Sequence, residues 1–428
     1  MWHRTLPLAL TLPAPRYLVL ATIDARFYLP GDPDWLRVGA AAALHLGVGG
    51  RSPSNPADPT KSTKIEMSQS KRSKPVTHSI ALVPGDGIGV DVIESGVEAL
   101  KALEAKLGTF GLEFVHYPYS VEHYQQHGCM MPEDGIQKLS QHDAIYFGAC
   151  GWPSVPDHIT LWQLILPIRK QLRQYINLRP VRVLKGSTFP LKCNAQDIDW
   201  VFVRENSEGE YSGQGGRTHP GEPFEMGTEV AIFTRPAIQR VMHFAFKTAQ
   251  SRPKKHLTIV TKSNAQRHGM VLWDEVAMEV AKSYPDVHTD KILVDAMTVA
   301  MVNRPQTMDT IVATNLHADI LTDLAAALAG SVGIATSANF NPDKSTPGMF
   351  EPIHGSAPDI KGQGIANPIG ALWAGADMLS HLGEAKASAL LMEAIEFCTS
   401  NGKVTKDMGG SLSTKEVTEQ VVEFIRQS

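Results

Sequence analysis

HSIALVPGDGIGVDVIESGVEALKALEAKL, residues 78–107, is the stretch that decides the fold. It begins as a short apolar run, passes through a glycine-rich turn, and continues with apolar residues at helical spacing. Strand character returns in LEFVHYPY, DAIYFGA, HLTIVTK, KILVDA and DTIVATN, and helical spacing returns around HGMVLWDEVAMEVAKSY. Strands that alternate with helices predict an α/β fold with a large, mostly parallel sheet.

Three segments depart from this alternation. Residues 160–175, TLWQLILPIRKQLRQY, predict a helix that is interrupted or kinked at Pro167. Residues 209–230 are rich in glycine, proline and threonine and predict a hairpin arm that projects from the body. Residues 331–368 are rich in glycine, proline and asparagine, so we expect a loop region there, followed by two or three closing helices.

The bulk composition is that of a globular enzyme. A chain of 428 residues with 43% hydrophobic and 20% charged residues suggests two or three domains. The formal net charge of −4 gives no reason to expect nucleic acid or an anionic membrane as partner. The four cysteines are scattered and form no CxxC pair, which indicates reduced thiols and a cytoplasmic protein. No apolar run is long enough to span a membrane.

The first 76 residues differ from the rest in composition, with prolines, small residues and a polar basic stretch. The first 23 residues contain Arg4 and Arg16 and no acidic residue, a pattern that fits a mitochondrial transit peptide. The plainer alternative is a disordered extension or a start codon placed too far upstream. We expect this extension to lie outside the fold.

Two sets of charged residues suggest the chemistry. Guanidinium groups pair bidentately with carboxylates, and carboxylate oxygens suit Mg²⁺ or Mn²⁺, so together they would hold a hydroxy-dicarboxylate against a metal. The ordinary alternative is a surface salt bridge for a single arginine and a solvated helix face for an isolated DxxxD pair. The two sets are Arg169, Arg179 and Arg204, and Asp295, Asp319 and Asp323.

Seven motifs occur in an order that resembles the β-decarboxylating dehydrogenases, which include 3-isopropylmalate, isocitrate and D-malate/tartrate dehydrogenases. They are PGDGIG (84–89), LPIRK with NLRP (166–180), VRENSEGEYSG (203–213), TKSN (261–264), VDAM (294–297), DILTD (319–323) and EPIHGSAPDIKGQGIANP (351–368). The resemblance covers residues 77–428. One departure is His317-Ala318, where related sequences usually have Phe-Gly; it leaves the aspartates in place.

The resemblance implies an isopropylmalate/isocitrate dehydrogenase-like fold of two domains with a mixed, mostly parallel sheet and a cleft between the domains. Residues 77–174 and 330–428 would form the large cofactor-binding domain, and residues 175–329 the small domain with the arm. The implied assembly is a homodimer with shared active sites, in which the arm clasps the partner.

The resemblance also implies roles for single residues. The three arginines would grip the substrate carboxylates, and Asp319 and Asp323 would bind the metal together with Asp295 of the neighbouring subunit. Lys262, also from the other subunit, would take the hydroxyl proton, since burial beside a metal and arginines makes a lysine release its own proton more readily. Tyr211 would act as the general acid after loss of CO₂.

The segment 354–368 is implied to bind the cofactor. Small residues let the backbone approach a dinucleotide closely, and an acidic side chain would accept hydrogen bonds from the ribose and repel a 2′-phosphate. This selects NAD over NADP. The glycines of PGDGIG form GxGxG, which we interpret as architecture. The proposed cofactor contacts are His354, Gly355, Ser356, Ala357, Asp359 and Asn367.

Substrate choice is expected to depend on the turn before Arg169, which carries Trp162, Ile165 and Leu166. DHITLW (157–162) resembles the DHxSLW of the D-malate/tartrate branch, and a tryptophan would fill the volume that an isopropyl group needs. We therefore expect D-malate or tartrate as substrate, unless Trp162 is a core residue that faces away from the pocket. The alternatives are a 3-isopropylmalate dehydrogenase and a non-catalytic regulatory subunit of an isocitrate dehydrogenase-like complex.

Overall fold

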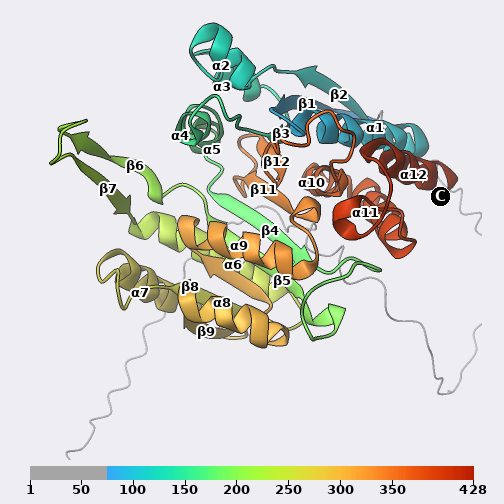
Figure 1. Cartoon of the computed structure of the whole chain (residues 1–428). Helices are drawn as coiled ribbons and strands as arrows, with labels where there is room; N and C mark the ends of the chain where they lie inside the picture. The colour runs from blue at the N-terminus through green and yellow to red at the C-terminus, as the bar shows by residue number, and fades with distance from the viewer. Residues whose placement is uncertain (1–74) are drawn as a thin grey trace, which may run out of the picture. The chain divides into compact units, whose positions relative to one another are not determined.

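The computed structural model describes residues 75–428, so the predicted extension lies almost wholly outside the described residues (Figure 1). The strands are β1 (Val76–Gly85), β2 (Phe110–His116), β3 (Ala144–Ala149), β4 (Ile176–Arg182), β5 (Asp199–Glu205), β6 (Gly209–Thr218), β7 (Met226–Ile232), β8 (His256–Thr261), β9 (His288–Leu293), β10 (Thr310–Ala313), β11 (Thr336–Phe340) and β12 (Gly348–Pro352).

The helices alternate with these strands along most of the chain. They are α1 (Gly89–Leu107), α2 (Val121–His127), α3 (Gly135–Leu139), α4 (Asp157–Thr160), α5 (Leu166–Gln171), α6 (Arg235–Ser251), α7 (Gly269–Ala281), α8 (Val294–Asn303), α9 (Asn315–Ala329), α10 (Ile369–His381), α11 (Ala385–Ser400) and α12 (Thr414–Gln427).

The described residues contain a ten-stranded sheet with the order β2-β1-β3-β12-β11-β4-β5-β10-β8-β9. The pairings are parallel except at β12-β11, β11-β4 and β4-β5 in the middle of the sheet. The predicted α/β class with a mixed, mostly parallel sheet is therefore confirmed.

Strands β3 and β10 are buried on both faces, which explains why their sequences are almost continuously apolar. In β1, Ile80 and Leu82 join the core under α1 and α10, whereas Ala81 and Val83 join the core beneath the segment of α2 to α5. In β10, Val312 faces the first of these cores and Ile311 faces a third core with α8 and α9. Side chains alternate between the faces of a strand, so each strand contributes to two layers.

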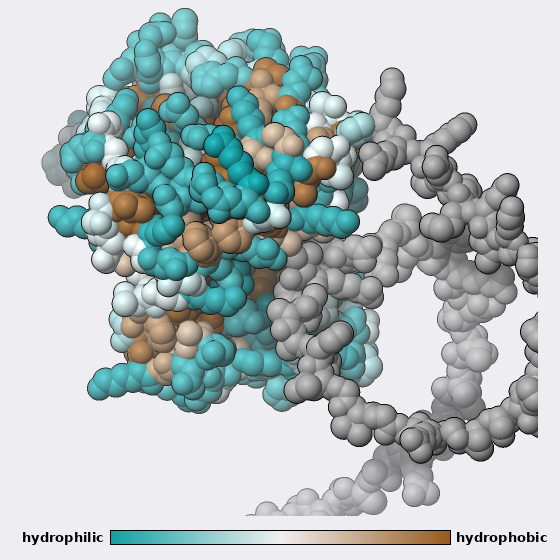
Figure 2. All heavy atoms as spheres, turned by 90° about the vertical axis from the view of Figure 1, so that its right-hand side faces the viewer, coloured by the Kyte–Doolittle hydropathy of each residue, from teal (hydrophilic) through white to brown (hydrophobic). Residues whose placement is uncertain are grey.

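The C-terminal helix α12 shows how the outer layer is fixed. Val417, Val421 and Ile425 recur at helical spacing and are buried against α1 and α11. Ser413 caps the helix, and its side chain and that of Glu416 form a capping box. Figure 2 shows that the side of the molecule carrying α11 and α12 is mostly hydrophilic, with scattered hydrophobic residues.

The loop of PGDGIG is tightly packed architecture, as expected. Gly87 has a φ of +58°, and a Cβ atom there would lie 1.9 Å from the carbonyl oxygen of Ser356. The Ile88 N–H donates to that same oxygen at 2.9 Å. The carboxylate of Asp86 accepts from the backbone N–H groups of Val121 and Gly151, both at 2.9 Å. The glycines thus join the loop after β1 to residues 353–357.

The helix predicted across Pro167 is continuous but irregular. A π-helical turn, Leu161–Ile165, separates α4 from α5, and Pro167 lies in the first turn of α5. Proline lacks the N–H that would continue the helical hydrogen bonds, and the π-helical turn directly before it accommodates this gap. The interruption therefore comes just before Pro167, and α5 ends at Gln171.

The predicted hairpin is present, because β6 and β7 pair antiparallel to each other and project at the left of Figure 1. The prediction of a loop over residues 331–368 was wrong in its middle, where β11 and β12 lie fully buried in the sheet. Their sequences, TSANF and GMFEP, contain buried polar residues that hide the apolar pattern of a strand. Three helices, α10 to α12, close the chain as expected.

The strand order bears on the proposed domains without deciding them. Strands of residues 77–174 and 330–428 form one half of the sheet, and strands of residues 175–329 form the other half. The halves meet where β11 pairs with β4. The division into two domains stays a prediction.

Candidate active site

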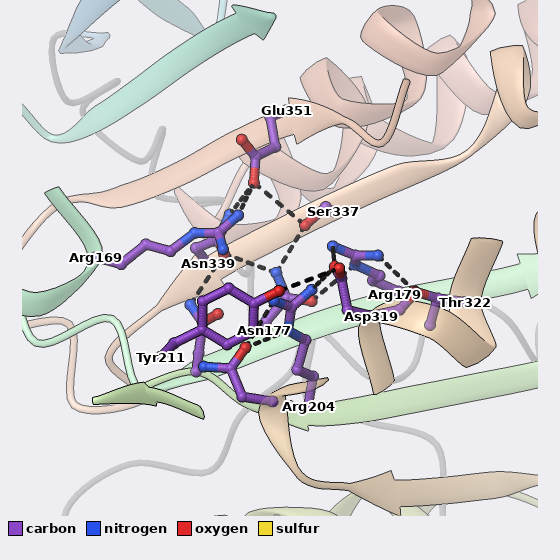
Figure 3. Close-up of polar contacts among 12 residues, drawn as sticks. Arg169, Asn177, Arg179, Arg204, Tyr211, Asp319, Thr322, Ser337, Asn339 and Glu351 are labelled. Carbon is purple, nitrogen blue, oxygen red and sulfur yellow. Dashed lines mark hydrogen bonds and ion pairs between the residues drawn. The ribbon is translucent and has the colours of Figure 1, made fainter. Parts of the chain in front are cut away.

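The three arginines predicted to bind carboxylates come from α5, β4 and β5, and all three are buried. On β4, Asn177 and Arg179 are two residues apart and so lie on one face of the strand. Arg204 on β5 is paired directly opposite Asn177. The antiparallel register therefore brings Arg179 and Arg204 together (Figure 3).

Arg204 is held by two residues of α9. Its Nε and Nη2 atoms donate to Oδ1 of Asn315 at 2.9 and 2.7 Å, and its Nη1 atom donates to Asp319. Asn315 and Asp319 are four residues apart, so they share one face of the helix. Burial lowers the pKa of Arg204, while the Asp319 carboxylate raises it.

Arg179 has three partners. Its Nε atom donates to Oδ1 of Asn177 at 3.0 Å, and its Nη1 atom donates to Oγ1 of Thr322 at 2.5 Å. Its Nη2 atom lies 3.6 Å from Oδ1 of Asp319. Burial, together with the charge of Arg204, lowers the pKa of Arg179 to about 9, so the guanidinium remains protonated at neutral pH.

Arg169 forms a separate buried ion pair. Its Nη2 atom donates to Oε1 of Glu351 on β12 at 2.7 Å, and Asn339 donates to the same oxygen at 2.7 Å. The Nε atom of Arg169 is buried and has no partner among the described residues. The pKa values of Arg179 and Arg204 are lowered in part by the Arg169 charge, which places the third cation near the other two.

Asp319 lies at the centre of the cluster. Burial raises the pKa of its carboxyl, but Arg204 and Arg179 outweigh burial and hold the pKa below its usual value. The hydroxyl of Tyr211 lies 3.5 Å from Oδ2 of Asp319, and the guanidinium of Arg204 lies 5.7 Å from the centre of the Tyr211 ring. Burial raises the pKa of Tyr211, and so does Asp319.

Asp323 lies one helical turn beyond Asp319 and is exposed. Although the residue is exposed, its carboxyl is partly buried, and this partial burial, together with the Asp319 charge, raises the pKa of Asp323 against the opposing charge of Arg179. Two carboxylates on one helix face, one of them ionised by arginines, fit two oxygen ligands of a hard divalent cation. Within one copy of residues 75–428, no group of three metal-binding side chains is assembled.

The third predicted ligand, Asp295, lies elsewhere in the chain. It is in the first turn of α8, and its Oδ1 atom is 2.5 Å from Nζ of Lys262, which follows β8. The Asp295 side chain is 65% exposed. The two residues form an ion pair that does not include Arg204 or Asp319, and their predicted role in the site of another copy stays a prediction.

The predicted cofactor loop follows β12. Gly355 is exposed, and a Cβ atom added there would meet nothing within 4 Å. The Nε2 atom of His354 is buried without a partner among the described residues, and burial lowers the pKa of this histidine. Asp359 is exposed, with its carboxylate free of any described ion pair. These features fit a ribose and an adenine ring.

The other residues predicted for this loop have structural contacts. Ser356 is buried, and Ala357 adopts a left-handed backbone with a φ of +39°. The side-chain amide of Asn367 donates to Asp407 at 2.9 Å and accepts from the Ile369 N–H at 3.0 Å. Asn367 therefore links Asp407 to the backbone at the start of α10.

The predicted specificity residues lie on the π-helical turn and at the start of α5. Trp162 is 41% exposed, so it is not a core residue. A Cβ atom on Gly213 of the arm would lie 2.7 Å from the Trp162 ring, which shows how closely the ring packs there. Ile165 is half-buried and Leu166 is buried. Contact of these side chains with a substrate stays a prediction.

The sequence reasoning missed the neutral residues that hold the arginines. Asn315, Thr322, Asn177 and Asn339 are buried, and each bonds to an arginine or to the glutamate that pairs with one. Glu351 begins the motif of residues 351–368, but no role was predicted for it. The available signal was spacing, since Asn315 precedes Asp319 by one helical turn and Asn177 precedes Arg179 by two residues.

Comparisons with known proteins match most of the chain to one family. The family model "Isocitrate/isopropylmalate dehydrogenase" matches residues 79–421. A probable tartrate dehydrogenase/decarboxylase of Agrobacterium vitis is 58% identical over 352 residues, 82% of this chain and 97% of that protein. The D-malate dehydrogenase [decarboxylating] of Escherichia coli (strain K12) is 45% identical over 82% of this chain and 99% of its own length.

The solved structures give the same result. The isocitrate dehydrogenase of Methylococcus capsulatus superposes with a TM-score of 0.75 at 31% identity, covering 82% of this chain and all of that one. None of the helices in the described residues is both long and apolar enough to cross a membrane. The resemblance drawn from seven motifs is confirmed: the chain belongs to the isocitrate/isopropylmalate dehydrogenase family of decarboxylating dehydrogenases.

Proposed function

We propose that the protein oxidises and decarboxylates a 2-hydroxy dicarboxylic acid, tartrate or D-malate, with NAD and Mg²⁺ or Mn²⁺. The observation that carries this proposal is the cluster of three buried arginines around Asp319. Buried guanidinium groups are stable only when anions accompany them, and a dianionic substrate would supply the missing charge. The names of the relatives at 58% and 45% identity support the choice of acid.

The metal would be held by Asp319 and Asp323 of one copy and Asp295 of a second copy. When bound, it supplies a Lewis acid that polarises the substrate oxygens. Asp319 would be shared between this cation and the two arginines that contact it. Asp319 of α9 would therefore join the metal site to Arg204 of β5 and Arg179 of β4.

Two residues would handle protons. NAD, when bound, would supply the hydride acceptor, and Lys262 of the second copy would take the proton of the substrate hydroxyl. Tyr211 keeps its own proton at neutral pH because burial and Asp319 raise its pKa. It is therefore suited to donate a proton to the carbon from which CO₂ has left.

A second copy is proposed for two reasons. Lys262 and Asp295 lie on the surface, outside the arginine cluster of their own chain. The nearby helices α8 and α9 also expose apolar side chains, with Val299, Val302 and Ile320 at 58%, 46% and 57% exposure. A homodimer would bury these side chains and complete two identical sites. The β6-β7 arm is exposed as well and would clasp the partner.

A substrate and cofactor panel tests the proposal. Purified protein should reduce NAD with D-malate or tartrate, use NADP poorly, and lose activity with a chelator of divalent cations. If 3-isopropylmalate were far the best substrate, the interpretation of Trp162 would be wrong and the alkylmalate alternative would stand. If the chain alone turned over none of these acids, it would be a regulatory subunit instead.

A further inference from the structure

The acceptors that orient Arg204 and Arg179 are mostly neutral. The amide oxygen of Asn315 accepts from two nitrogens of Arg204, at 2.9 and 2.7 Å. The hydroxyl oxygen of Thr322 accepts from Nη1 of Arg179 at 2.5 Å. Figure 3 shows Thr322 and Asn177 on either side of the Arg179 guanidinium. Two acceptors on a planar guanidinium fix its direction.

Asn315 and Thr322 both belong to helix α9, which carries the proposed metal ligands. Asn315, Asp319, Thr322 and Asp323 recur along one face of α9. Thr322 is fully buried, and its hydroxyl donates to the carbonyl oxygen of Asp319 at 3.1 Å. Because this bond uses the hydroxyl proton, the lone pairs of Thr322 are left to accept from Arg179.

Neutral acceptors orient a cation without cancelling its charge. Arg179 and Arg204 share one carboxylate, Asp319, so together they keep a net positive charge. Arg169 differs, since Glu351 pairs with it alone among the arginines. We propose that Asn315 and Thr322 are positioning residues that fix Arg204 and Arg179 and leave their charge to the substrate carboxylates. This inference rests on the proposed function.

The substitution Asn315→Asp separates orientation from charge, because it keeps the acceptor and adds a carboxylate. Calorimetric titration of D-malate into protein with Mg²⁺, without NAD, should show a Kd raised about 10- to 100-fold, the effect of losing a charged contact. The circular dichroism spectrum and the NAD affinity should not change. The control Asn401→Asp adds the same charge to an exposed residue at the end of α11 and should bind D-malate normally.

The substitutions Thr322→Val and Thr322→Ser test Arg179 independently and do not require Asn315→Asp to fold. Valine removes the acceptor with little change of volume and should raise the KM for D-malate about tenfold or more, with a much smaller effect on kcat. Serine restores the hydroxyl and should restore the KM. If Thr322 had a purely structural role, the substitutions would instead change the thermal stability. The Thr322→Val and Thr322→Ser variants would then have nearly the same KM for D-malate.

The outcomes are distinguishable. A native protein that binds neither D-malate nor tartrate overturns the proposed function and, with it, this inference. The positioning roles alone are overturned if the native protein binds D-malate or tartrate but the two variants behave like it. In that case the folded Asn315→Asp variant would bind with the native affinity, and the Thr322→Val variant would have the native KM. The predicted pattern is weak binding by both variants and normal binding by Thr322→Ser and Asn401→Asp.

Discussion

At the scale of single residues, the charged residues of the site could be predicted from the sequence, whereas the neutral residues that hold the arginines could not. The arginines and aspartates could be singled out because they lie in the motifs, and four of the six come together in the structure: Arg169, Arg179, Arg204 and Asp319. Asn315 and Thr322 are ordinary helix residues by composition. Their role follows only from the register that sets α9 against β4 and β5.

The charge of Asp359 is predicted to determine the preference for NAD over NADP. Asp359→Lys replaces an exposed carboxylate on the proposed nucleotide loop by a cation, so the KM for NAD should rise about 10- to 100-fold and the KM for NADP should fall. Steady-state kinetics with both cofactors measures this. Glu98→Lys on the exposed face of α1 is the matched control. An unaltered KM for NAD would mean that the ribose is held elsewhere.

At the scale of elements, helices and strands with a periodic apolar pattern could be predicted from the sequence, whereas strands with buried polar residues could not. The strand and helix of residues 78–107 follow directly from their apolar spacing. In β11, Ser337 and Asn339 are buried because they bond to Asn177 and Glu351 on neighbouring strands. Those partners are remote in sequence, so no local pattern indicates that TSANF is a strand.

Asp377 of helix α10 is predicted to make the stability of the protein depend on pH. Burial raises the pKa of Asp377 to about 7, and Thr336 donates to its carboxylate at 3.2 Å. Between the unfolded pKa near 3.9 and the folded value, the native state binds a proton that the unfolded chain does not. Stability therefore falls as pH rises through this window, by at most about 1.4 kcal/mol per pH unit, and levels off above it.

Asp377→Asn removes this titration and keeps an acceptor for Thr336. Urea unfolding at several pH values should show the variant gaining stability over the native protein as pH rises from about 4 to 7, with a constant difference above that range. Parallel stability curves for the two proteins would show that Asp377 is ionised in the native state throughout.

At the scale of the whole molecule, the proposed reaction uses residues from two copies of the chain. One chain assembles Arg179, Arg204, Tyr211 and Asp319, yet Lys262 and Asp295 pair with each other on the surface. The sequence alone identifies both groups by their motifs. It does not tell which residues of one chain meet, since that depends on how the strands are ordered in the sheet.

Mixing two inactive variants tests this requirement. Asp319→Asn should lack the metal ligand, and Lys262→Met should lack the proton acceptor, so each homodimer should be inactive. In a mixed dimer, one site would combine the intact Asp319 of one chain with the intact Lys262 of the other. Refolding the two variants together should therefore restore NAD reduction with D-malate to about a quarter of the native rate. No activity above that of the separate variants would contradict an active site shared between subunits.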